Sequence, residues 1–315
     1  MIALFSWMPE QASDIATRVD LLFFGLLAVC GMIAFAVAAA VIIFCVRYRA
    51  GSAATHARPR GSVLGLELLW TSATTVLFLA IFGAAAAEYR HMTSAPANAV
   101  EVHVVAKQWM WKLQHPDGRR EINELHLLIG RPVKLVMTSQ DVIHSFFIPA
   151  FRTKQDVLPD RYTTEWFTPT KAGRYHLFCA EYCGMDHSRM GGWIEVMEPA
   201  AYAQWLAAGG EGETVVAAGA RLFTARGCAG CHAPGSKVRA PLLNGLYGRP
   251  VALNGGQVQI ADEQYLHDSI LLPNKQITAG YEPLMPTYQG QLGEEDVLQL
   301  IAYIKSLSGD PESAP

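Results

Sequence analysis

A long apolar stretch near the N-terminus constrains this chain more than any other feature. Residues 21–46 run for 26 positions without a charged side chain, and at about 1.5 Å per residue such a helix crosses a hydrocarbon core of roughly 30 Å with length left for tilt. A second stretch, residues 68–87, is 20 residues long and also uncharged. Buried helices of soluble domains seldom exceed about 14 residues without a polar face. The sequence therefore predicts a transmembrane hairpin of two helices, at about residues 19–47 and 65–89.

Basic residues set the expected orientation of this hairpin. The connecting loop carries four arginines, whereas the first 20 residues carry one: Arg47, Arg49, Arg58 and Arg60 against Arg18. Because basic loops stay on the cytoplasmic side, we expect both termini, and everything after residue 88, on the outer or periplasmic face of a bacterial plasma membrane. The first 20 residues lack the basic start and long apolar centre of a cleaved signal peptide.

Composition agrees with a membrane-anchored chain and argues against nucleic-acid binding. Charged residues make up 17% of the chain, below the roughly one quarter that is usual in soluble domains. The formal net charge of -3 leaves no basic excess with which to neutralise phosphates. We expect membrane lipid as a partner and no nucleic acid.

Two further domains are expected after the hairpin segment, which occupies residues 1–95. Residues 96–208 contain short strand-like runs separated by turn signals, at 100–106, 132–139, 161–168, 173–180 and 191–198, which predict a small β-sandwich. The Gly-rich run at 209–213 predicts a flexible linker. It opens a third domain, residues 209–315, which closes with an amphipathic helix at 294–307.

One cluster of sulfur and imidazole side chains dominates the β-rich region. It comprises His144, Cys179, Cys183, His187 and Met190. Such soft ligands suit copper, whereas zinc has little use for Met, and two thiolates four residues apart can bridge two metal ions. A disulfide is the alternative, and it is the one that the cysteine spacing alone would favour.

A second motif lies in the C-terminal domain. Cys228, Cys231 and His232 have the spacing of c-type haem attachment, in which two thioethers hold the porphyrin and the histidine binds iron. A thioredoxin-like motif is the rival, but it lacks the following histidine. Met285, the only Met of this domain, is the expected sixth ligand.

With these motifs in place, the chain resembles cytochrome c oxidase subunit II, in the branch that carries a fused C-terminal cytochrome c domain. The match runs over about residues 15–200, through HSF at 144–146, KQD at 154–156 and Pro159-Asp-Arg161, to the complete CAEYCGMDHSRM loop at 179–190. The resemblance implies a multidomain membrane protein with a two-helix hairpin, a cupredoxin-like β-sandwich and an all-α class I cytochrome c domain.

The resemblance also implies roles for individual residues. It makes the five side chains of the cluster, with the backbone carbonyl of Glu181, the ligands of the dinuclear copper centre CuA. The Glu181 carboxylate would help to hold Mg²⁺ at the contact with subunit I. Trp109, expected on an early strand in Trp109-Met110-Trp111, matches the position where electrons enter, although a core role for one of the two Trp residues is equally open. Glu67 matches the mouth of a proton path, and its alternative role is an acid among lipid headgroups.

The expected function follows from this family. The chain would be the electron-entry subunit of a haem-copper terminal oxidase, taking electrons from a soluble cytochrome c or another small redox protein. It would pass them through haem c and CuA to subunit I, of the haem a and CuB type, which reduces oxygen and pumps protons in a complex with subunit III. No catalytic residue is expected in this chain itself. A relay serving a CuA-type nitric oxide reductase remains an alternative. A copper-carrying assembly protein is another, against which the haem motif argues.

Overall fold

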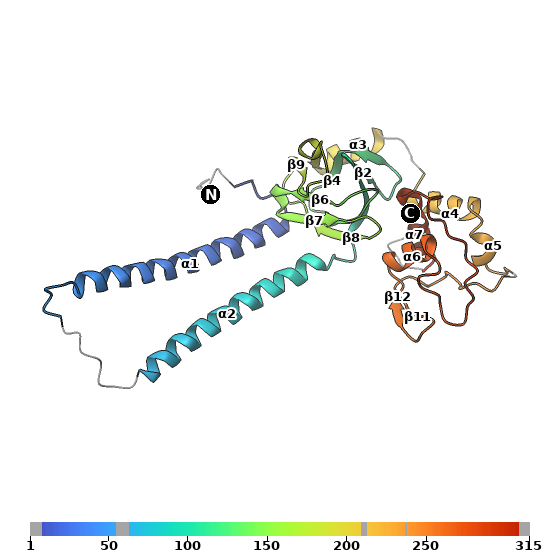
Figure 1. Ribbon diagram of the computed structural model, residues 1–315. Coiled ribbons are helices and arrows are strands. Elements are labelled where there is room, and N and C mark those ends of the chain that lie inside the picture. Colours follow the sequence, from blue (N-terminus) through green and yellow to red (C-terminus); the bar gives the residue numbers. More distant parts are fainter. Residues whose placement is uncertain (1–7, 55–62, 209–212, 237, 309–315) are drawn as a thin grey trace. The chain divides into compact units, whose positions relative to one another are not determined.

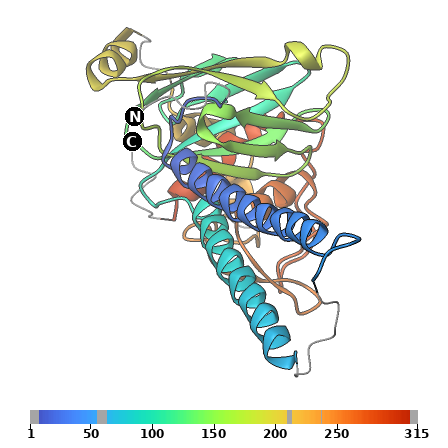
Figure 2. The same ribbon diagram turned by 90° about the vertical axis from the view of Figure 1, so that its left-hand side faces the viewer.

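The computed structural model describes residues 8–54, 63–208, 213–236 and 238–308. These form two compact units (Figures 1 and 2). One is the helical hairpin, residues 15–93, and the other contains the described residues before 15 and after 93. Each unit is considered by itself.

The hairpin consists of helix α1, Asp14–Arg47, and helix α2, Leu64–Thr93, seen in Figure 1 as the two long coils. Both are long and apolar enough to cross a membrane. The helix α1 begins five residues before the predicted 19, and α2 ends four residues after the predicted 89. The added residues include the charged or polar Asp14, Arg18, Arg90 and His91, and an ion pair of 3.2 Å joins Arg18 of α1 to Glu88 of α2. The predicted contribution of Arg58 and Arg60 to orientation falls outside the described residues.

The predicted β-sandwich is confirmed as two five-stranded sheets. The first has the order β3-β2-β1-β5-β8 and the second β4-β10-β9-β6-β7. Their bounds are β1 Val100–Lys107, β2 Met110–Gln114, β3 Arg120–Ile122, β4 Glu124–Leu128, β5 Val133–Ser139, β6 His144–Ile148, β7 Thr153–Val157, β8 Thr163–Phe167, β9 Gly173–Cys179 and β10 Gly191–Met197. Short 3-10 helices follow β6 and precede β10, at η1 Pro149–Phe151 and η2 His187–Arg189.

The strands bury alternate side chains between the sheets, as the pleat requires. On β1 the inward positions Val102, Val104 and Ala106 are all fully buried, and Trp111 and Phe146 fill the space between the sheets from opposite sides, with ring centroids 5.0 Å apart. Strands β3, β4, β6 and β7 were not expected from the sequence, because each has only three to five residues and too little alternation to stand out.

The C-terminal domain is mainly helical, as predicted. Its elements are α4 Val215–Ala225, α5 Ala229–His232, α6 Glu263–Leu271 and α7 Glu294–Ser306, together with a small ribbon of β11 Pro250–Ala252 and β12 Val258–Ile260; helix α3, Pro199–Ala208, precedes them. The predicted apolar face of α7 is buried at Val297, Leu300, Ile301 and Ile304. Helices α4 and α7 pack backbone to backbone at Gly219, where an added Cβ would lie 2.0 Å from the carbonyl oxygen of Gln299. Of the predicted linker 209–213, only Glu213 lies within the described residues.

Candidate copper centre and haem pocket

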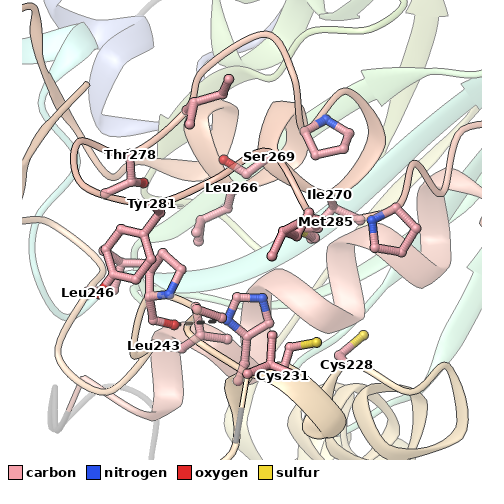
Figure 3. A pocket seen from close by; sticks show the side chains of 18 of the residues that line it. Cys228, Cys231, Leu243, Leu246, Leu266, Ser269, Ile270, Thr278, Tyr281 and Met285 are labelled. Carbon is pink, nitrogen blue, oxygen red and sulfur yellow. Dashed lines mark hydrogen bonds between the residues drawn. The ribbon is translucent and has the colours of Figure 1, made fainter. Parts of the chain in front are cut away.

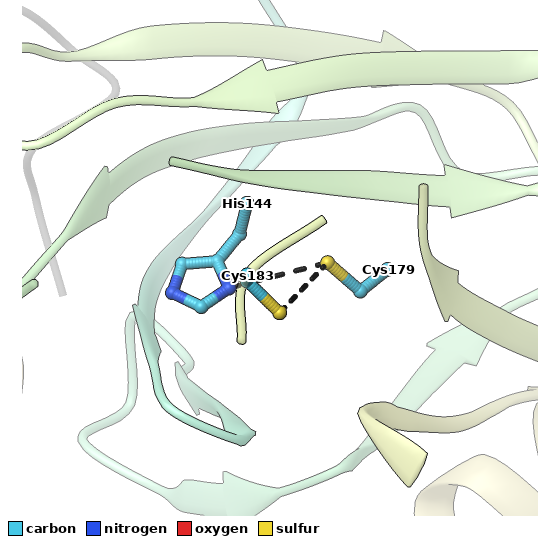
Figure 4. A group of neighbouring side chains, drawn as sticks. All are labelled: His144, Cys179 and Cys183. Atoms are coloured by element: carbon cyan, nitrogen blue, oxygen red, sulfur yellow. Dashed lines mark hydrogen bonds between the residues drawn. The ribbon is translucent and has the colours of Figure 1, made fainter. Parts of the chain in front are cut away.

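The second sheet brings three of the predicted ligands together at one end of the sandwich (Figure 4). His144 is the first residue of β6, Cys179 is the last of β9, and Cys183 lies in the loop that follows. The sulfur atoms of Cys179 and Cys183 are 3.8 Å apart, and the Nδ1 atom of His144 lies 4.0 Å from the Cys179 sulfur. Since a disulfide bond is about 2.05 Å long, the two cysteines are free thiols, and all three side chains are buried.

The remaining predicted donors approach the same two sulfur atoms. His187 places Nδ1 3.5 Å from the Cys183 sulfur, and the Met190 thioether sulfur lies 3.7 Å from it. The backbone carbonyl oxygen of Glu181 is 3.2 Å from the Cys179 sulfur, whereas its carboxylate belongs to an exposed residue. The donor set is therefore two thiols, two imidazoles, a thioether and a carbonyl, which fits copper better than a harder metal.

Burial and mutual contact separate the acidities of the two thiols. Burial opposes ionisation of Cys179, but hydrogen bonds with His144, Cys183 and the backbone at Glu181 and Ser145 together outweigh it and lower the pKa of this thiol to about 6. Burial and the adjacent Cys179 raise the pKa of Cys183 to about 12. Cys179 is therefore the more acidic of the two thiols.

A carboxylate that sequence reasoning did not assign fixes the orientation of His144. The Nε2 atom of this histidine lies 2.9 Å from Oδ1 of Asp141, and an ionised carboxylate can only accept, so Nε2 carries a proton and Nδ1 is the ring nitrogen that faces the sulfur atoms. Burial opposes ionisation of Asp141, but backbone N–H groups of Gln108 and Val142 and the His144 ring donate to it and lower its pKa. An acid three residues before a ligating histidine was the signal available in the sequence.

Trp109 contacts the ligand loop through its indole nitrogen, which donates to the Cys183 carbonyl oxygen at 3.2 Å. The side chain of Gln108 donates to the same oxygen at 2.8 Å. The expectation that Trp109 lies on a strand is wrong, since β2 begins at Met110 and Trp109 occupies the tight turn before it. Trp109 is half-buried and Trp111 fully buried, so the two rings differ in exposure as expected.

The haem motif lines an apolar pocket in the C-terminal domain, drawn in Figure 3 with Cys228, Cys231 and Met285 around it. The His232 Nδ1 atom lies 2.9 Å from the carbonyl oxygen of Pro241. Because that carbonyl can only accept, Nδ1 carries the proton and Nε2 is left free to bind a metal. The apolar walls come from residues on several elements, including Phe223, Leu243, Leu246, Leu266, Ile270, Leu300 and Ile304. These residues fit a covalently attached haem.

Glu67 stands apart from both sites. It lies in the first turn of α2 and is exposed, so its geometry favours neither of the two roles expected for it. Two histidines outside both sites pack against neighbouring side chains: His176 lies against Trp193, with ring centroids 3.8 Å apart, and His267 is buried between Asp268 and Glu294.

Comparison with known proteins gives two family matches. Residues 120–197 match the family "Cytochrome C oxidase subunit II, periplasmic domain", and residues 216–308 match "Cytochrome c". The "Cytochrome c oxidase subunit 2" of Thermostichus vulcanus is 30% identical over 253 residues, which cover 63% of this chain and 77% of that protein. The "Alternative cytochrome c oxidase subunit 2" of Bradyrhizobium diazoefficiens is 32% identical over 149 residues, 38% of this chain and about half, 54%, of that protein. A crystal structure of the periplasmic domain of cytochrome oxidase subunit II from Bradyrhizobium japonicum aligns at 28% identity and a TM-score of 0.35, over 37% of this chain and 96% of that one.

Proposed function

The chain belongs to the cytochrome c oxidase subunit 2 family, and from this premise we propose that it is the electron-entry subunit of a haem-copper terminal oxidase. Its donor is a soluble cytochrome c or another small redox protein, and its acceptor is subunit I of the same complex. Oxygen reduction and proton pumping then take place in subunit I, in a complex with subunit III.

One observation carries the proposal: four further donor atoms of the expected types, two imidazole nitrogens, a thioether sulfur and a carbonyl oxygen, converge on two free sulfur atoms that are 3.8 Å apart. A dinuclear CuA centre at these residues, and a haem c on Cys228 and Cys231 with His232 and Met285 at its iron, supply reversible one-electron transfer when bound.

The surrounding residues keep the donors in place. Asp141 fixes the ring of His144, while Gln108 and Trp109 hold the carbonyl of Cys183. Met190 is 2% exposed, so water is kept from the sulfur atoms. Ligands held by such outer hydrogen bonds move little on a change of charge, and small movement is what fast electron transfer needs.

Three further roles are part of the proposal. Trp109 is the point of direct electron entry, supported by its partial exposure and its bond to a ligand residue. The Glu181 carboxylate is exposed and suits Mg²⁺ at the contact with subunit I, since Mg²⁺ prefers hard oxygen ligands. Glu67, in the first turn of α2, opens a proton path, with an acid among lipid headgroups as the alternative role.

The proposed location is the bacterial plasma membrane, crossed twice by α1 and α2, with both redox domains on the periplasmic or outer face. Arg47 and Arg49, in the described part of the connecting loop region, support this orientation.

Metal analysis and spectroscopy of the purified chain test the proposal. We expect two copper ions per haem c, a c-type α band and an electron paramagnetic resonance signal of one electron shared by two copper nuclei. A single copper ion, zinc, or a stable Cys179–Cys183 disulfide in the purified chain would rule out the dicopper centre. Assaying the native complex with oxygen and with nitric oxide separates the oxidase from a nitric oxide reductase, and spontaneous release of the copper to an acceptor protein would instead favour an assembly role.

A further inference from the structure

The face of the first sheet that points away from the sandwich core is covered by the C-terminal domain. Val105 of β1 and Val136 of β5 point to this face and form a buried cluster with Leu298 of α7. Leu298 is 1% exposed, and Tyr162, from the loop before β8, packs against both this cluster and the core of the helical domain. The two domains thus share a continuous apolar contact within one compact unit.

Four charged side chains form a closed ring beside this apolar contact, two from each domain. Lys305 of α7 places Nζ 2.9 Å from Glu101 on β1 and 3.1 Å from Glu263 of α6. Lys134 of β5 contacts the same two carboxylates at 3.2 and 3.6 Å. Each ammonium group therefore touches one carboxylate of its own domain and one of the other.

The ring is shielded from water and has further hydrogen bonds. The side chains of Lys305 and Glu263 are 19% and 16% exposed, and the Tyr247 hydroxyl donates to Glu263 at 2.6 Å. A partly buried ring with alternating charge is far less weakened by salt than an exposed pair, and the loss of one member leaves like charges facing each other.

The chain segment that joins the two domains is held at both ends by one turn. Arg119, in the turn between β2 and β3, donates to the carbonyl oxygens of Trp205 and Leu206 at the end of α3, at 3.0 and 2.8 Å. On the other flank, the backbone nitrogen of Val215 donates to Pro116 at 3.3 Å. A Cβ on Gly118 would lie 1.8 Å from the carbonyl oxygen of Glu213, so the start of the helical domain also abuts this turn.

We propose that the ring of Glu101, Lys134, Glu263 and Lys305 locks the helical domain onto the sandwich in one orientation, so that the two domains exchange electrons across a fixed contact. The locking is a structural claim, and only its consequence for electron transfer rests on the proposed function.

Helix α7 is the layer that this contact places between haem pocket and sheet. Its Leu300 and Ile304 line the pocket, while Leu298 and Lys305 contact the sandwich. A helix with its side chains is about 10–12 Å across. A locked α7 therefore keeps the haem pocket at a constant separation, about one helix diameter, from the first sheet.

Maleimide labelling of a cysteine placed at Leu298 tests the lock in the full-length, cofactor-loaded chain. In the Leu298→Cys variant the new thiol is covered only while the domains are docked, and labelling at this position is read by mass spectrometry of the peptide. We expect labelling at least about tenfold slower than at a Leu242→Cys control, because Leu242 is 63% exposed. Adding Lys305→Met, which removes one charge from the buried ring, should speed labelling at residue 298 by about tenfold or more.

A matched control separates this effect from general loss of charge. Lys171→Met breaks an exposed ion pair with Glu10 and should leave labelling at residue 298 unchanged. Labelling of Leu298→Cys as fast as that of Leu242→Cys, or no acceleration by Lys305→Met, overturns the lock. Because the absorption spectrum of each labelled sample reports haem and copper separately, a failed lock with both centres present is distinguishable from a failure of the proposed function.

Discussion

At the scale of single residues, the proposed copper site depends on one carboxylate that no ligand motif contains. Asp141 accepts a hydrogen bond from Nε2 of His144 and two from backbone N–H groups. These bonds leave the His144 ring with one orientation and its Nδ1 toward the sulfur atoms. The ligand types could be predicted from the sequence, whereas the state of each donor atom depends on this neighbour.

Replacement of Asp141 by Asn tests that role. The amide keeps the shape but holds the imidazole N–H less strongly, so we expect copper affinity to fall about 10- to 100-fold, as for other outer partners of ligating histidines. Competition with a copper chelator measures the change. An Asp117→Asn variant, in an exposed turn, serves as control, and equal affinities in the two variants would refute the assignment.

At the scale of elements, helix α3 is held on the sandwich by a stack around one tryptophan. The ring of Trp205 lies parallel to that of His126, with centroids 4.8 Å apart, and the Arg119 guanidinium lies 4.1 Å from it on the ring face. The carboxylate of Glu121 forms hydrogen bonds with the rings of both His115 and His126. The packing of α3 thus depends on two histidines that share one carboxylate.

This arrangement predicts that α3 packs most firmly in mildly acidic solution. Burial opposes ionisation of Glu121, but the two histidines lower its pKa from 4.5 to about 2, so its contribution is present above pH 4.5 and is lost as the pH falls toward 2. The bond to Glu121, aided by Glu124 and Glu195, raises the pKa of His126 above 6.5. Its contribution is complete below pH 6.5 and is lost as the pH rises through the raised value.

Hydrogen exchange of the α3 segment, corrected for the intrinsic rate, checks this dependence. We expect lower protection at pH 9 than at pH 6 in the unaltered chain, and little change between these values in a His126→Gln variant, which cannot ionise. If the variant loses protection at pH 9 as much as the unaltered chain, the cause lies elsewhere.

At the scale of the whole molecule, the two cofactor sites are built from separate stretches of chain. The proposed copper donors lie between residues 144 and 190, on strands and loops of the sandwich. The proposed haem donors lie between residues 228 and 285, at α5 and in the segment before α7. No donor residue of one site comes from the stretch of chain that supplies the other.

Removal of copper should therefore leave the haem site intact. Treatment with a copper chelator under reducing conditions is expected to abolish the near-infrared copper absorption and to free two thiols at residues 179 and 183, while the c-type α band persists. Absorption spectra and thiol titration measure both outcomes. Loss of the α band together with the copper would mean that the helical domain depends on the metal centre for its fold.

Several features could be predicted from the sequence, because each depends on short-range pattern. The hairpin follows from charge-free length, the apolar face of α7 from helical period, and the choice of ligand residues from the spacing of side chains with distinctive chemistry. Lys305 illustrates the limit of such reasoning. A basic residue in the last turn of a helix interacts favourably with the helix dipole, but no sequence pattern relates Lys305 to its partner Glu101, 204 positions earlier.

Only the tertiary structure determines the contacts between side chains that neither the periodicity of the sequence nor the spacing of its motifs relates. In the folded chain Asp141 accepts a hydrogen bond from His144, and Trp109 donates one to the Cys183 carbonyl. Two histidines bind Glu121, and Lys305 completes the ring of four charges between the domains. A sequence by itself specifies which groups can ionise, bind metal or avoid water. Which of them meet depends on strand register and on the packing of one domain against another, and both are set by the burial of surfaces that lie far apart along the chain.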